Sequence, residues 1–128
     1  MSKEYIKAQT PLPAYFPYPK FLLQMSLSHT ARLTYVLLLD RMTLSQKNGW
    51  VDAQGRAYML YPLAGLAEDL QSSISSVTRA LRELEAARLI ERRSNGFSKP
   101  NQIFLGVPGL RRNAQSRWPK MSSLIAQK

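Results

Sequence analysis

The chain has 128 residues, with 18 lysines and arginines against eight acids, no cysteine and one histidine. This length suits one domain, or one domain with arms, and the absence of cysteine excludes disulfides and thiolate metal sites. The lone His29 cannot build a zinc site, and no apolar run reaches the roughly 18 residues of a membrane span. We therefore expect no metal, cofactor or membrane partner. Because residues 1–10 lack the apolar core of a signal peptide, we expect a cytoplasmic protein.

The positive charge is concentrated toward the C-terminal end. Residues 1–91 hold ten lysines and arginines and all eight acids, whereas residues 92–128 hold eight lysines and arginines and no acid. Such a one-sided basic block is typical of a nucleic-acid-binding surface. An acidic membrane surface is the competing partner, but the basic region lacks a sustained amphipathic helix with a broad apolar face. The charge pattern therefore favours nucleic acid.

Residues 1–19 alternate prolines with aromatic side chains. Four prolines in this stretch exclude a long helix. We predict an extended arm whose first ten residues are mobile. Its aromatic side chains are expected to pack on the body of the domain or on a partner; they are Tyr5, Tyr15, Phe16 and Tyr18.

Two helices are predicted after the arm. Residues 19–25 form a short helix that begins with proline, and residues 26–47 form the longest helical pattern, with Ser28 as its N-cap. The run from Leu33 to Leu39 is apolar on nearly all sides, so this helix either forms the centre of the domain or meets a second copy of the chain. We expect a homodimer, formed through this helix or through the arm. Asn48-Gly49 ends the helix.

Residues 50–61 predict extended structure around a turn. Asp52 to Gly55 forms the turn, and Arg56 to Tyr61 forms a strand. This strand pairs either with a later hairpin or with Trp50-Val51 in a small hairpin of its own. Arg56 is able to pair with Asp40 or Asp52.

Residues 62–86 predict a helix-turn-helix. Apolar residues recur at helical spacing from Leu63 to Leu70, and a polar break follows at residues 71–73. Ser73 is a candidate N-cap for the second helix, whose apolar stripe is Ile74, Val77, Leu81 and Leu84. Ser75, Arg79, Arg82 and Glu83 fall on the opposite side. The second helix of this motif lies in the DNA major groove, where arginine can bind guanine. The alternative is an ordinary helical hairpin with an Arg79–Glu83 ion pair.

A strand, a turn-rich loop and a second strand follow, at residues 89–93, 94–100 and 101–105. A hairpin directly after a helix-turn-helix is a wing, so the predicted fold is α+β, mainly α, a winged helix-turn-helix. The wing carries basic and amide side chains suited to phosphates or to a minor groove, namely Arg92, Arg93, Asn95 and Lys99. The alternative is a hairpin with solvated charges.

The predicted organisation has three parts: an arm at residues 1–15, a winged-helix domain at 16–107, and a basic tail or linker at 108–128. The predicted DNA-binding residues come from the second helix and from the wing. They are Ser73, Ser75, Ser76, Thr78, Arg79, Arg82, Arg92, Arg93, Asn95, Lys99 and Asn101.

Residues 16–105 resemble the N-terminal domain of the replication initiator protein A (RepA) family of low-copy plasmids in Gram-positive bacteria. The most specific part of the resemblance is LLLDRMTLSQKNGWVDAQGRAY; FPYPKFLLQM and VTRALRELEAARLIERRSNGFSKPNQIFL also carry it. The resemblance implies a winged-helix domain that binds repeated origin sequences in double-stranded DNA and starts plasmid replication. It also implies a downstream domain, tied to host range, through which host replication proteins are recruited. The SSISS and GLRRNAQSRWPK stretches do not match, so the DNA sequence that is bound stays open.

Catalysis finds little support in the sequence, which has no glycine-rich phosphate loop and no carboxylate cluster for magnesium. We therefore expect a binding protein and not an enzyme. Two alternatives to the initiator remain: a winged-helix transcription regulator, and a module that binds protein through the apolar helix and the aromatic arm.

Overall fold

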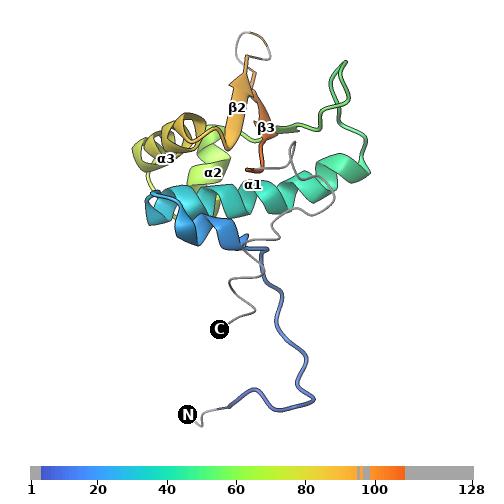
Figure 1. Cartoon of the computed structure of the whole chain (residues 1–128), viewed down its shortest axis with the longest axis vertical. Helices are drawn as coiled ribbons and strands as arrows, with labels where there is room; N and C mark the ends of the chain where they lie inside the picture. Colours follow the sequence, from blue (N-terminus) through green and yellow to red (C-terminus); the bar gives the residue numbers. More distant parts are fainter. Residues whose placement is uncertain (1–3, 95, 97–98, 109–128) are drawn as a thin grey trace.

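The computed structural model describes residues 4–94, 96 and 99–108. In these residues the regular elements follow one another in the order shown in Figure 1. They are the 3-10 helix η1 (Lys20–Gln24), α1 (His29–Lys47), β1 (Met59–Leu60), α2 (Leu63–Leu70), α3 (Ile74–Ala86), β2 (Ile90–Arg93) and β3 (Gln102–Leu105).

In Figure 1, helix α1 runs beneath α2, α3 and the sheet, and η1 lies on the other side of it. The predicted N-cap is confirmed, because the Ser28 hydroxyl accepts a hydrogen bond from the backbone N–H of Ala31. Gly49, at φ +72°, lies in the left-handed conformation that ends the helix. Tyr35 and Leu38 of the apolar run are fully buried, so α1 forms the centre of the domain as one alternative predicted.

The sheet is antiparallel with strand order β1-β3-β2. β1 pairs with β3 through Met59 opposite Ile103, so the early strand joins the wing hairpin as predicted. The alternative small hairpin is also present, with a bridge between Val51 and Ala57. Because that hairpin includes the first residues of the predicted strand, β1 is shorter than expected.

The elements meet in one apolar core. Leu22 of η1, Leu66 of α2 and Leu84 of α3 are fully buried in it. The phenol of Tyr35 donates a hydrogen bond to the carbonyl of Gly106 (2.9 Å), which joins α1 to the end of the wing. The predicted winged helix-turn-helix, mainly α, is therefore confirmed, with α2 and α3 followed by the β2–β3 hairpin.

The arm extends away from this body in Figure 1, and residues 4–19 form no regular element. Tyr5, Tyr15 and Phe16 are 74%, 79% and 53% exposed, so these side chains do not pack on the body. The predicted basic tail lies outside the described residues, apart from Pro108. In the described part of the chain, no helix combines the length and the apolar character that crossing a membrane requires.

Candidate nucleic-acid interface

The turn between α2 and α3 has the geometry of a helix-turn-helix. α2 ends at Leu70, and its C-cap Gln71, with a φ of 52°, lies in the left-handed region. The backbone N–H of Ser72 then donates to the carbonyl of Ala67 (2.9 Å), and α3 begins two residues later. The polar break predicted at residues 71–73 is therefore the turn that sets α3 against α2.

A cluster of hydroxyl groups forms the start of α3. The Ser73 oxygen accepts from the backbone N–H of Ser76 (3.1 Å), which confirms the predicted N-cap. The same oxygen lies 3.2 Å from the Ser75 hydroxyl and 3.0 Å from the Ser76 hydroxyl. Small hydroxyl side chains and the N–H groups of a first helical turn together can bind a phosphate.

The outer face of α3 carries the two arginines that the sequence predicted. Arg79 and Arg82 are both exposed. The guanidinium of Arg79 makes a long contact with the Ser76 hydroxyl (3.5 Å), and neither arginine forms an ion pair within the described residues. Thr78 is less available, because its hydroxyl donates to the backbone carbonyl of Ile74 (2.8 Å). The arginine side chains therefore project from α3 toward solvent.

Ile74 corrects the sequence analysis. Helical periodicity placed it in the buried stripe with Val77, Leu81 and Leu84, and those three residues are buried. Ile74 itself is 51% exposed, because the first residue of α3 lies beyond the core that covers the rest of the stripe. Helical periodicity alone could not distinguish this exposed isoleucine from a core residue. Its position between two serines at the start of the helix was the sequence feature that could have indicated exposure.

Glu83 also differs from its predicted environment. It accepts hydrogen bonds from the backbone N–H (2.9 Å) and the hydroxyl (2.7 Å) of Ser28, the N-cap of α1. These two bonds, the backbone one first, lower the pKa of Glu83 below its ordinary value. The Arg79–Glu83 ion pair of the helical-hairpin alternative is not found among the described residues. Glu83 therefore fixes α3 to the start of α1.

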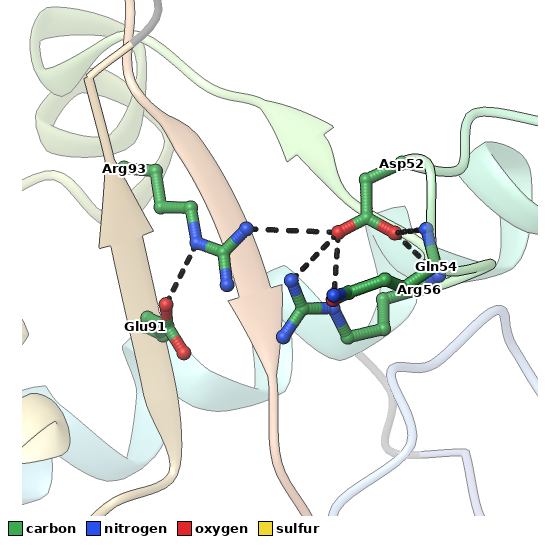
Figure 2. A network of polar contacts seen from close by, with 5 residues as sticks. All are labelled: Asp52, Gln54, Arg56, Glu91 and Arg93. Carbon is green, nitrogen blue, oxygen red and sulfur yellow. Dashed lines mark hydrogen bonds and ion pairs between the residues drawn. The ribbon is translucent and has the colours of Figure 1, made fainter.

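The two arginines of the wing point to opposite faces of the sheet, as successive strand residues do. Arg92 faces α3, where its Nε and Nη2 donate to the two carboxylate oxygens of Glu85 (3.0 and 2.8 Å). This pairing lowers the pKa of Glu85. Arg93 faces the other way and pairs with Glu91 (2.8 Å) and, at 3.6 Å, with Asp52 (Figure 2). Both arginines thus have carboxylate partners that the sequence did not reveal.

Near the tip of the wing, Lys99 and Asn101 are exposed, and Asn95 lies outside the described residues. Lys99 and Asn101 line a surface hollow together with Tyr61 and Pro62, which lie just before α2. α3 lies beside β2 in Figure 1, and the strands β2 and β3 rise beyond the helices. The structure therefore presents an arginine-bearing helix next to a hairpin that carries an exposed lysine.

Comparisons with known proteins agree with this architecture. The sequence model of the family described as replication initiator protein A (RepA) N-terminus matches residues 14–116. A 41 kDa protein of Lactobacillus helveticus is 28% identical over 116 residues, which cover 83% of this chain and 33% of that protein. The chain thus spans about a third of the length of this relative.

Two solved structures share the fold. The first is described as the structure of a Rep–DNA complex; it is 30% identical, with a TM-score of 0.65, over 74% of this chain and 76% of that one. The second is described as the structure of an MDR initiator; it is 28% identical, with a TM-score of 0.64, over 85% of this chain and 89% of that one.

Proposed function

The chain belongs to the family of replication initiator protein A (RepA) N-termini, and on that premise we propose that it binds double-stranded DNA at repeated origin sites and so initiates plasmid replication. The observation that carries the proposal is the outer face of α3, where Arg79 and Arg82 are exposed and form no close ion pair with a carboxylate of the described residues. A helix with such a face, following a helix-turn-helix turn, suits the major groove.

Each part of α3 has a proposed contact. Arg79 and Arg82 donate to guanine O6 and N7, because a guanidinium can form two parallel hydrogen bonds to that edge. The hydroxyl cluster of Ser73, Ser75 and Ser76 lets the helix start approach a phosphate. Ile74, exposed beside this cluster, supplies an apolar surface for a thymine methyl group.

The wing supplies contacts that are independent of sequence. Lys99 and Asn101 are exposed and suit the DNA backbone or a minor groove. A lysine that neutralises a phosphate releases counterions, so its contribution falls as the salt concentration rises. We therefore propose that α3 selects the DNA sequence and that the wing strengthens binding to DNA of any sequence.

The remaining proposals concern partners and setting. We propose a homodimer, supported by the exposed apolar residues Leu33 and Leu44 of α1 and by the exposed aromatic residues of the arm. Host replication proteins are proposed to bind a downstream domain. The protein is proposed to act in the cytoplasm, where plasmid DNA resides, as a binding protein without enzymatic activity.

The first experiment is selection of bound duplexes from a random pool, followed by a search for the selected sequence near the gene. Repeated copies within or beside the coding region support the initiator, whereas one site in a promoter would favour a transcription regulator. For a rigid dimer, contacted half-sites should repeat about 10–10.5 base pairs apart or at a multiple of that. Failure to retain any duplex at low salt would refute DNA binding altogether and would favour a protein-binding module.

The second experiment repeats the selection with Arg79→Ala. Loss of the bidentate contact should cost ~1–3 kcal/mol at the preferred site and relax the preference at one base position. Lys47→Ala is the matched control, because Lys47 is an exposed cation at the far end of α1. An unchanged base preference for Arg79→Ala would show that another surface selects the sequence.

A further inference from the structure

The carboxylate of Asp52 joins the small hairpin of residues 50–58 to Arg93 at the end of β2 in the wing (Figure 2). Its Oδ1 accepts from the backbone N–H groups of Gln54 and Arg56, at 2.9 Å each. Its Oδ2 accepts from the Nε of Arg56 (2.9 Å) and lies 3.6 Å from the Nη1 of Arg93. The hydrogen bonds that Asp52 accepts, first from the backbone N–H of Arg56 and then from the Arg56 side chain and the backbone N–H of Gln54, lower the pKa of its carboxyl group. One side chain thus closes the hairpin turn and reaches a wing strand.

The two arginines that contact Asp52 also lie over one aromatic ring. Phe104 has the guanidinium of Arg93 4.8 Å and that of Arg56 5.3 Å from its ring centroid. Tyr58 of the hairpin lies 5.8 Å from the same ring. Two guanidinium groups at one ring repel each other, and Asp52 contacts both of them, which offsets the repulsion.

Arg93 lies at the level of the sheet where the third strand, β1, ends beside the wing hairpin. It is the last residue of β2 and pairs with Gln102, the first residue of β3. The supporting strand β1 reaches no further, since Leu60 also pairs with Gln102. At this level Arg92 is tied to Glu85 of α3 on one face of the sheet. Arg93 is tied to Asp52 on the other face.

We propose that Asp52 is a positioning residue which, through Arg93, sets the direction of the wing so that Lys99 meets the DNA backbone. The inference rests on the proposed function of the wing. Arg93 acts here through the orientation of the hairpin, because its guanidinium already has Glu91 and Asp52 as partners. A wing released on one face can bend away from α3, and its tip then no longer reaches the duplex to which α3 is bound.

The test measures whether Lys99 still contributes when Asp52 is changed. Binding of the whole chain to a random-sequence duplex is titrated at several salt concentrations. In the unsubstituted background, Lys99→Gln should lower the slope of log K against log salt by about one. In the Asp52→Asn background, which keeps an oxygen for the turn but removes the charge, Lys99→Gln should leave the slope unchanged. Asp40→Asn is the control, because it removes an exposed acid from α1, and there the effect of Lys99→Gln should persist.

Arg93→Gln is the second variant, since it leaves the Asp52 turn intact and should also abolish the effect of Lys99→Gln. If thermal melting shows that Asp52→Asn does not fold, the Arg93→Gln background tests the positioning role in its place. A Lys99 effect that persists in the folded variants would overturn the positioning role alone. An unsubstituted chain that binds no duplex, or whose slope does not respond to Lys99→Gln, would overturn the proposed function of the wing together with this inference.

Discussion

Replacing Glu83 by alanine tests how α3 is held in place. The Glu83 carboxylate accepts two hydrogen bonds from Ser28, at 2.9 and 2.7 Å, at the start of α1. Hydrogen bonds to a charged group contribute about 1.5–3 kcal/mol each when buried, and a carboxylate at a helix N-terminus adds about 0.3–1 kcal/mol. Because Glu83 is only half-buried, solvent screening reduces the sum, and we expect Glu83→Ala to lower the free energy of unfolding by about 1–2 kcal/mol.

Urea denaturation at neutral pH measures this difference, and Glu68→Ala is the control, because Glu68 is an exposed glutamate on α2. The pH dependence gives a second measurement. Since folding lowers the pKa of Glu83 from its ordinary value of 4.5, the carboxylate stabilises the fold above that pH and loses its effect as the pH falls through the folded-state pKa. The gap between the unsubstituted chain and Glu83→Ala should therefore close in acid.

A loss no larger than that of Glu68→Ala would refute the reasoning, because the contact with Ser28 would then add nothing to stability. A gap that stays constant in acid would show that the charge is not its cause. The double variant with Ser28→Ala completes the test. If the two residues act through one contact, the combined loss should be smaller than the sum of the single losses.

Two further predictions concern packing and alkaline pH. Gly106→Ala would place a Cβ 2.9 Å from the backbone carbonyl oxygen of Arg88, so urea denaturation should show a loss of about 1–3 kcal/mol in the free energy of unfolding. Gly65 lies inside α2, and a Cβ added there would meet its nearest neighbour at 3.6 Å, so Gly65→Ala should be neutral or stabilising. Equal losses for the two variants would contradict the packing argument. Burial, followed by a hydrogen bond to a carboxylate, raises the pKa of Tyr61 from 10.0 to about 12. The contribution of Tyr61 to stability should be complete below pH 10 and lost as the pH rises toward 12. Ultraviolet absorbance titration of the folded protein, compared with that of Tyr61→Phe, follows the ionisation of this phenol. A Tyr61 phenol that ionises near pH 10 in the folded protein would disprove the prediction.

The sequence by itself determined the features that depend on neighbouring residues. Ser28 and Ser73 are N-caps because the hydroxyl that caps a helix and the N–H that it accepts from are three residues apart. Asn48-Gly49 ends α1 for a similar reason, since the left-handed conformation at Gly49 depends on that residue's own backbone. The strands of the wing and the turn between α2 and α3 were predicted on the same basis, and together these elements gave the winged helix-turn-helix.

Only the tertiary structure decided which outer-face residues are available to DNA. Helical periodicity placed Arg79 and Glu83 on the same side, yet Glu83 contacts Ser28, 55 residues earlier in the chain, while Arg79 remains exposed. Ile74 fits the apolar period but lies beyond the core at the start of α3. Arg92 and Arg93 are adjacent, and packing gives one to α3 and the other to Asp52. Periodicity gives the direction of a side chain from its own element, whereas the partner of a long charged side chain depends on which other element packs beside it.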